Sequence, residues 1–193
     1  MISIDQICGE KENCRNRALE YTLELAVEIA REGREGHRIG TIFVVADEER
    51  VLRRSRNLIL DPLLGHPEDA RRICDPNLRE TIKELAQLDG AFIVSGEGVV
   101  RSAARYINAT ADGIDLPLGL GSRHMAAASI TRETDAVAVV VSESAMVRIF
   151  NHGSLVTEIL PEIWLFSRRS IKIQGPHRES TVADLRIVAR ETG

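Results

Sequence analysis

Cysteine is scarce in this sequence, which has only Cys8, Cys14 and Cys74. They form no Cys-x-x-Cys pair and show no spacing typical of a metal site. A small, odd number of cysteines is typical of proteins that keep their thiols reduced, which predicts a cytoplasmic location. The three positions therefore indicate neither a zinc centre nor a disulfide framework.

Long hydrophobic runs and an excess of positive charge are also missing. No apolar stretch approaches the length of a membrane span, and the opening Met-Ile-Ser-Ile-Asp is unlike a signal peptide, so we expect no membrane partner. Lysine and arginine number 25 against 29 aspartates and glutamates, which gives a net charge of −4. This balance argues against nucleic-acid binding, which normally requires a basic excess. It leaves room for nucleotides, because a nucleotide needs only a local positive charge.

Three well-known motifs of phosphate and hydrolytic chemistry are absent. There is no Gly-x-x-x-x-Gly-Lys-Ser/Thr loop, no His-Glu-x-x-His helix and no Gly-x-Ser-x-Gly elbow. Gly96-Glu-Gly98 is a tight turn, because no third glycine opens a helix after it. A phosphate site in this chain must therefore use another scaffold.

What remains is the composition of an ordinary globular domain, with 44% apolar and 28% charged residues. Helical spacing of apolar residues runs from Arg15 to Glu32, and Asp75-Pro76 is a favourable helix start. Val51-Leu52 is interpreted as the start of a short strand. Further strands are expected at 40–46, 99–107, 136–142, 146–150 and 155–160, and residues 88–95 are expected to lead from a helix end into a strand. The mixture predicts an α/β fold, a mixed twisted β-sheet flanked by helices on both faces.

The predicted elements divide the chain into three parts. We expect an N-terminal helix over residues 1–36 and a main domain over 37–160. Residues 161–193 are expected to form a segment that is packed on this domain or extends it.

The stretch Leu118–Ile130 carries the first candidate site. Glycines at 119 and 121 precede Ser122, a favourable N-cap for a short helix with Arg123 and His124 in its first turn. Backbone N–H groups, a guanidinium and an imidazole at one helix start can hold an anion, above all a phosphate. The alternative is a glycine-rich turn before a small packing helix.

Two further polar positions stand where helices and strands end. Asp89-Gly90-Ala91 lies between a helix and a strand, and Ser142-Glu143 directly follows the most strongly predicted strand. Taken alone, each is typical of a turn. Together with Arg123 and His124, two carboxylates could serve a metal-assisted phosphate reaction. The same residues could instead form a structural cluster of ion pairs.

These motifs resemble those of a known family. Asp89-Gly90-Ala91, followed at a distance by Gly-Ser-Arg-His, is similar to the paired DGA and RHR motifs of diadenylate cyclase domains. The resemblance extends to the flanking segments, Gly40-Thr-Ile-Phe-Val-Val among them, and covers roughly residues 38–155. Met125 stands where the family usually has an arginine, and Ser144 where a second glutamate is common. The short chain is similar to the stand-alone or archaeal-type members.

The resemblance implies an enzyme that condenses two ATP into cyclic di-AMP and two pyrophosphates. It also implies a divalent cation, Mg²⁺ or Mn²⁺, and two subunits face to face, hence a homo-oligomer. Asp89, Arg123 and His124 would be catalytic, with Arg123 neutralising phosphate charge. Asp89, His124 and Glu143 would hold the metal, although His124 could instead hold the phosphates. Substrate contacts are expected at Gly90, Ala91, Ile107, Leu120, Gly121, Ser122 and Ser142, with the adenine near Ile107 and Leu120.

Two alternatives to an active cyclase remain at this point. Met125 and Ser144 motivate the first, a nucleotide-binding module of the same fold with little or no turnover. The second is an unrelated interaction domain in which the Arg123-His124 helix packs internally.

Overall fold

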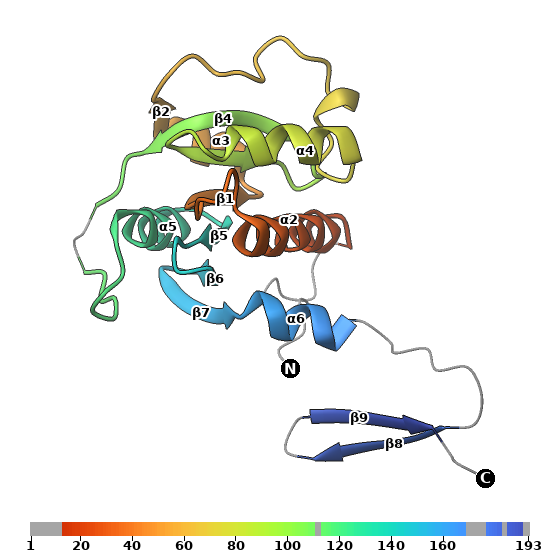
Figure 1. Ribbon diagram of the computed structural model, residues 1–193. Coiled ribbons are helices and arrows are strands. Elements are labelled where there is room, and N and C mark those ends of the chain that lie inside the picture. Colours follow the sequence, from red (N-terminus) through yellow and green to blue (C-terminus); the bar gives the residue numbers. More distant parts are fainter. Residues whose placement is uncertain (1–12, 111–112, 169–176, 183–184, 191–193) are drawn as a thin grey trace. The chain divides into compact units, whose positions relative to one another are not determined.

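The computed structural model describes residues 13–110, 113–168, 177–182 and 185–190 (Figure 1). The chain forms two compact units, Met1–Pro161 and Glu162–Gly193. The second unit contains most of α6 (Pro161–Arg168) and a hairpin of β8 (His177–Val182) and β9 (Leu185–Arg190). The two candidate motifs lie in the first unit.

A seven-stranded sheet organises the first unit, in the order β2-β4-β3-β1-β5-β6-β7. The central strand β1 pairs with β3 in parallel and with β5 in antiparallel orientation, and every other pair is antiparallel. The predicted mixed sheet is therefore confirmed. Its strands are β1 (Thr41–Val45), β2 (Ser55–Asn57), β3 (Ala91–Val94), β4 (Val100–Ile107), β5 (Val137–Val141), β6 (Val147–Asn151) and β7 (Ser154–Ile159).

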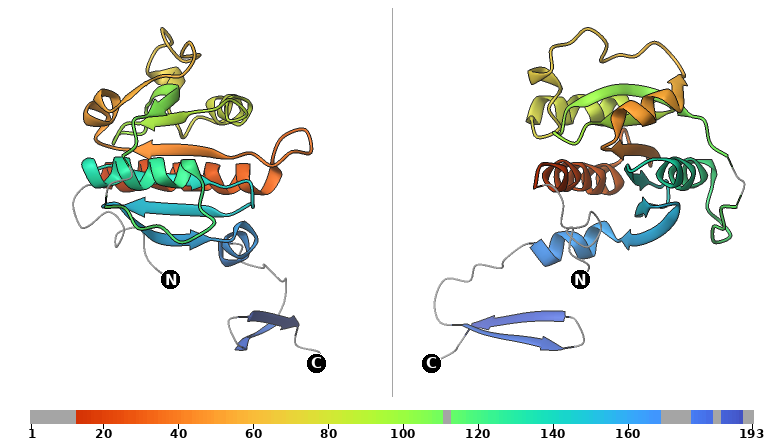
Figure 2. Two further views of the ribbon diagram at one scale, coloured as in Figure 1. Left: turned by 90° about the vertical axis from the view of Figure 1, so that its left-hand side faces the viewer. Right: turned by 180° about the vertical axis from the view of Figure 1, so that it is seen from behind.

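Helices cover both faces of this sheet, as the sequence predicts. In Figures 1 and 2, α2 (Asn13–Glu32) and α5 (Ser122–Glu133) lie on opposite sides of the central strands. The helix α4 (Pro76–Leu85) shares the face of α2, and α3 (Glu48–Arg53) shares the face of α5. A short 3-10 turn, η1 (Asp69–Arg71), precedes α4.

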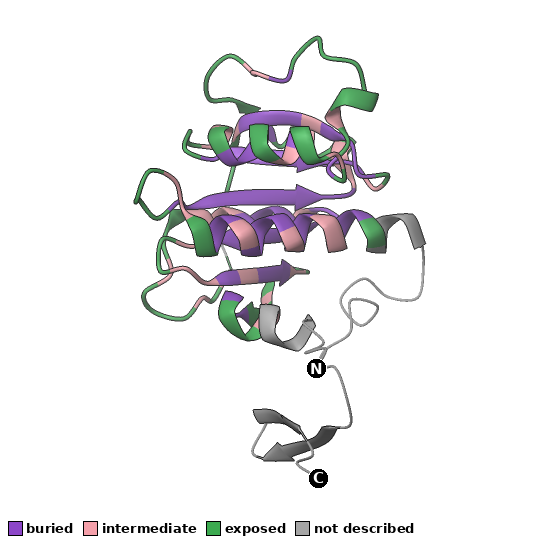
Figure 3. Ribbon diagram, turned by 45° about the vertical axis from the view of Figure 1, so that its right-hand side comes forward, coloured by how far each residue is buried: buried purple, intermediate pink, exposed green. Residues whose placement is uncertain are grey.

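The core is divided between these two faces by the alternation of side chains along each strand. Ile42 and Val44 of β1 belong to a buried cluster with Ala127 and Ile130 of α5. Because successive strand residues point to opposite faces, Phe43 lies on the α2 side, where its ring stacks on Phe92 with centroids 5.1 Å apart. Figure 3 shows the central strands buried, the outer side of α4 largely exposed and that of α2 mostly of intermediate exposure.

Two helix starts were predicted with different success. Asp75 caps α4 as expected, since its carboxylate accepts hydrogen bonds from the backbone N–H groups of Asn77 and Leu78. At α5 the N-cap is Gly121 and not Ser122, so the predicted start is one residue late. Arg123 and His124 still fall in the first turn.

The strand predicted to start at Val51-Leu52 is wrong, because these residues belong to α3. Ala46 and Asp47 both have a positive φ between β1 and α3, which turns the chain sharply into a helix. Glu48 and Glu49 in the first turn and Arg50 and Arg53 in the last turn suit the dipole of a helix.

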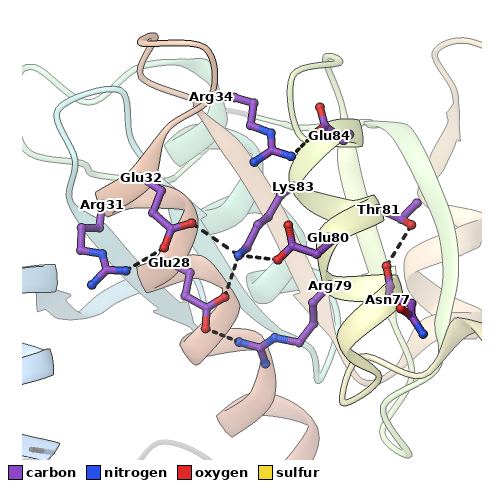
Figure 4. Close-up of polar contacts among 10 residues, drawn as sticks. All are labelled: Glu28, Arg31, Glu32, Arg34, Asn77, Arg79, Glu80, Thr81, Lys83 and Glu84. Carbon is purple, nitrogen blue, oxygen red and sulfur yellow. Dashed lines mark hydrogen bonds and ion pairs between the residues drawn. The ribbon is translucent and has the colours of Figure 1, made fainter.

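Charged side chains join α2 to α4 (Figure 4). The ammonium group of Lys83 is nearly buried and lies within 3.4 Å of carboxylate oxygens of Glu28, Glu32 and Glu80. Burial alone would lower the pKa of Lys83, but its hydrogen bonds to Glu80 and Glu28 outweigh burial and raise it. The cluster fixes α4 against α2 on one side of the sheet.

Within the described part of the chain, no helix combines the length and apolar character that a membrane crossing demands.

We predict that Lys83→Met lowers the free energy of unfolding by about 1–2 kcal/mol, because three carboxylates then repel one another without a cation. Chemical denaturation measures this change. The control is Arg53→Met, because Arg53 and its partner Glu49 are both highly exposed and their ion pair should contribute little. Equal losses in the two variants would contradict a stabilising role for the Lys83 cluster.

Candidate active site

Gly90 fixes the backbone conformation next to Asp89. Its φ is +111°, and a Cβ at this position would lie 2.7 Å from the backbone carbonyl carbon of Ala104 on β4. Ala104 itself has a positive φ of 51°, at an irregularity in the pairing of β3 with β4. Only glycine permits this close approach. The carboxylate of Asp89, just before β3, is largely exposed.

Arg123 joins the three predicted polar positions. Its Nη2 lies 3.0 Å from Oδ1 of Asp89, and its Nη1 lies 3.2 Å from Oε1 of Glu143. The arginine side chain is 34% exposed, whereas the two carboxylates are 81% and 68% exposed. A Cβ at Gly40 would lie 3.0 Å from Nη1, so this glycine makes room for the guanidinium. Residues 89, 123 and 143, far apart in sequence, therefore meet in one cluster.

A pocket of about 470 Å³ adjoins this cluster. Asp89 and Arg123, which belong to the predicted motifs, contribute charged groups to its lining. Much of the remaining lining is apolar. It is lined by Ile42, Leu58, Asp89, Gly90, Ala91, Arg105, Tyr106, Ile107, Ala109, Ser122, Arg123, Met125 and Ala126. Its size is in the range of pockets that bind small organic ligands.

The other predicted substrate-binding residues lie near the pocket but do not line it. Leu120 packs against the buried cluster that contains Ile107. Gly121 caps α5. The hydroxyl oxygen of Ser142 lies 2.9 Å from that of Ser144 in the turn after β5, next to Glu143. The pocket brings together Gly90, Ala91, Ile107 and Ser122, and their roles in binding stay predictions.

His124 contacts the sheet and not Asp89. The residue is only 7% exposed, and its Nε2 lies 3.3 Å from Nη1 of Arg148 on β6. Its Nδ1 is buried and makes no hydrogen bond. Burial lowers the pKa of His124, as do the positive charges of Arg148 and Arg123, while Glu158 and the Gly121 carbonyl act in the opposite direction. The net effect lowers the pKa of His124 and favours the neutral imidazole.

No metal-binding group of three or more His, Cys, Asp or Glu residues is formed within the described ranges. Asp89 and Glu143 are the predicted metal ligands that come together, both on the guanidinium of Arg123. His124 as a third ligand stays a prediction.

Several residues at the site were missed from the sequence. Tyr106 and Leu58 line the pocket, and the guanidinium of Arg56 lies 4.6 Å from the ring centroid of Tyr106. The one signal for Tyr106 is its place in a predicted strand, which does not say what the strand faces. Arg105 is another, and burial lowers its pKa while its guanidinium binds the carbonyls of Leu52 and Ser55.

One wall of the pocket is attached to β4 through Asp61. The carboxylate accepts hydrogen bonds from the hydroxyl of Ser102 at 2.6 Å and from the backbone N–H groups of Ala103 and Leu63. Leu58 N–H donates to the Ala104 carbonyl at 2.9 Å. The loop after β2 is thus bound to the same strand that carries Tyr106 and Ile107.

In chemical terms, the site combines an apolar pocket with a guanidinium, two exposed carboxylates and a helix start. A planar ring suits the apolar lining, and a phosphate suits Arg123 and the N–H groups of α5. The carboxylates can bind a cation or a hydroxyl proton. This set of groups fits a nucleotide better than a purely apolar ligand.

A protein-family model matches most of this chain. The family model described as the DisA bacterial checkpoint controller nucleotide-binding domain, DAC, matches residues 28–155. The range contains every predicted site residue.

Two curated relatives are archaeal proteins named diadenylate cyclase. The protein of Methanocaldococcus jannaschii is 48% identical over 161 residues, which are 83% of this chain and 51% of the relative. The protein of Haloferax volcanii is 41% identical over 142 residues, 73% of this chain and 52% of the relative. The chain thus spans about half the length of the curated relatives that it matches.

Solved structures show the same fold at lower identity. A hypothetical membrane spanning protein from Bacillus cereus has a TM-score of 0.55 at 21% identity, over 74% of this chain and 64% of that one. A double mutant of DacA from Staphylococcus aureus has a TM-score of 0.50 at 23% identity, over 79% of this chain and 93% of that one. With the match over residues 28–155, these findings show that the chain belongs to the DAC family of nucleotide-binding domains.

Proposed function

We propose that this chain is a diadenylate cyclase, which condenses two ATP molecules into cyclic di-AMP and releases two pyrophosphates. The observation that carries the proposal is Arg123, held by Asp89 and Glu143 beside a largely apolar pocket. The DAC family match and the names of the two archaeal relatives support it.

The pocket and the helix start divide the binding of ATP between them. Ile107, Ile42 and Met125 offer apolar surface for the adenine, and Leu120 supports Ile107 from the core. Arg123, Ser122 and the N–H groups at the start of α5 would bind the phosphates. The triphosphate competes with Asp89 and Glu143 for the guanidinium, so binding must loosen at least one of these ion pairs.

The reaction is governed by charge and alignment. The 3′-oxygen of one ATP forms a bond to the α-phosphorus of the other, the bond from that phosphorus to the β-bridging oxygen breaks, and pyrophosphate leaves. The 3′-hydroxyl proton passes to a base, for which Asp89 is the exposed carboxylate at hand. A second identical step closes the ring.

The carboxylates fit the divalent cation that the proposed reaction requires. Asp89 and Glu143 are exposed oxygen donors, which both Mg²⁺ and Mn²⁺ accept, and nothing in the pair selects between the two ions. A bound cation would neutralise charge on the phosphates and lower the barrier to attack. It would also replace Arg123 as the partner of Asp89, which frees the guanidinium for phosphate.

The proposed reaction needs two copies of the chain. Each 3′-hydroxyl attacks the α-phosphate of the other nucleotide, so the ribose of each ATP must lie beside the α-phosphate of the other. One pocket of about 470 Å³ suits one nucleotide, which points to two subunits with these pockets face to face.

The test is incubation of the protein with ATP and Mn²⁺ or Mg²⁺, followed by mass spectrometry. We expect cyclic di-AMP, formed at a rate that rises faster than linearly with protein concentration when the protein is dilute. ATP that stays intact or is hydrolysed to ADP would contradict the proposal.

Met125 favours a second candidate, a nucleotide-binding module with little turnover. It lines the pocket at the place where the family motif has a cation, and Ser144 offers a hydroxyl in place of a carboxylate. Tight binding of ATP or cyclic di-AMP in calorimetry, without product, would favour this candidate. If ATP leaves the melting temperature unchanged, an unrelated interaction domain is favoured instead.

We predict that Asp89→Asn lowers turnover by roughly 10²-fold or more and leaves the fold intact, because the lost charge serves the metal or the hydroxyl and the side chain is exposed. Product formation and thermal unfolding are measured together. Asp135→Asn is the matched control, since this exposed carboxylate also pairs with an arginine, Arg50, and lies outside the pocket lining. Near-normal turnover of Asp89→Asn would refute the role of Asp89.

We predict that Arg123→Ala weakens ATP binding about tenfold or more and slows turnover, because a charged hydrogen bond to phosphate is lost and two carboxylates stay unpaired. Calorimetry with ATP measures the affinity. Arg123→Lys keeps the charge without the planar fork, so its affinity for ATP should lie between those of the wild type and Arg123→Ala. A loss of stability with unchanged affinity would assign Arg123 a structural role only.

A further inference from the structure

The imidazole of His124 is fixed on the sheet by a second arginine. His124 lies in the first turn of α5, and its Nε2 is 3.3 Å from Nη1 of Arg148, on β6 beneath it. The ring also lies against Phe150 of the same strand, with centroids 6.1 Å apart. Only 7% of the residue is exposed, so this contact is shielded from water.

Arg148 is itself oriented by an ion pair on the neighbouring strand. Its Nε lies 2.5 Å from Oε1 of Glu158, which stands directly opposite in the pairing of β6 with β7. The side chain of Arg148 is 14% exposed. A carboxylate on one side and an imidazole on the other therefore hold one guanidinium in place.

The contact fixes where the proton of a neutral imidazole resides. A guanidinium has only donor groups, so Nε2 of His124 must accept the hydrogen bond. In a neutral ring the other nitrogen, Nδ1, then carries the proton. Burial and the two nearby arginines lower the pKa of His124, which favours the neutral ring.

No hydrogen bond of ordinary geometry reaches the buried Nδ1, although the Gly121 carbonyl acts on the ring as an acceptor. A buried donor that is poorly satisfied in this way is costly. A metal ion cannot bind at Nδ1 while the proton is present, because ligation needs the lone pair.

We propose that Arg148 is a positioning residue that fixes His124 as its Nδ1–H tautomer. With the proton on Nδ1 and Nε2 bound to Arg148, neither ring nitrogen is then available to ligate the divalent cation. The functional part of this inference rests on the proposed cyclase activity, whereas the tautomer is a property of the free protein.

The experiment is two-bond ¹H–¹⁵N correlation spectroscopy of protein with ¹⁵N-labelled histidine, at a pH well above the ordinary histidine pKa. The His124 signals are assigned by their loss in His124→Gln. We expect the wild-type ring to be protonated at Nδ1. In Arg148→Met it should move toward the Nε2–H tautomer that free imidazoles favour, and Arg148→Lys, which keeps a donor, should largely retain the wild-type state.

The matched control is Arg54→Met. Arg54 pairs with Glu133 in the last turn of α5, so it anchors the same helix at the end remote from His124. This variant should lose stability without a change of tautomer. A wild-type ring protonated at Nε2, or a ring protonated at Nδ1 in both wild type and Arg148→Met, would overturn the proposal. If Arg148→Met fails to fold, the wild-type spectrum still tests the tautomer, because a ring protonated at Nε2 overturns the proposal.

The metal is tested with Mg²⁺ and ADP. We expect Nδ1 to keep its proton at saturating concentrations of both, and loss of that proton with a large shift of the ¹⁵N signal would show ligation and overturn the proposal. An Nδ1–H ring in a protein that makes no cyclic di-AMP would refute the proposed function alone.

Discussion

The site depends on one guanidinium that two carboxylates share. Arg123 joins Asp89 at the start of β3 to Glu143 after β5, and these strands flank the central strand β1. Gly40 leaves space for the guanidinium just before β1 begins. Three segments that the sheet brings to one edge are thus connected by a single side chain. The side chains of Arg123, Asp89 and Glu143 are all partly exposed. A phosphate or a cation can therefore replace one member of this cluster without unfolding the sheet.

Much of the fold could be predicted from local patterns. The strands β1 and β5 are buried on both faces, and such strands appear in sequence as unbroken apolar runs. The helix α4 has both a cap and an apolar stripe. Val51 and Leu52 were assigned wrongly because two apolar residues have no distinctive period, and the left-handed Asp47 that starts α3 is not visible in the sequence. Serine is the stronger capping residue in isolation, so the sequence favours Ser122, whereas the N-cap in the structure is Gly121.

The candidate site could be predicted only as far as its motifs extend. Asp89 and Arg123 were expected to meet because both belong to motifs of one family, and their ion pair agrees with that expectation. Leu58 and Tyr106 were missed, since both reach the pocket through the pairing of β2 with β4, two segments far apart in the sequence. His124 was predicted to act beside Asp89, yet whether a helix residue faces the pocket or the sheet depends on packing that no motif encodes.

Asp61 has a consequence for how the pocket can change shape. Its carboxylate ties the loop after β2 to Ser102 and Ala103, so Leu58 and Tyr106 belong to one mechanically continuous wall. That wall is part of the sheet and resists displacement as the sheet does. The opposite wall is the first turn of α5, which His124 holds on β6 through Arg148 and Phe150. Both walls are thus fixed to the same seven-stranded sheet, so the sheet sets the width that a ligand must match.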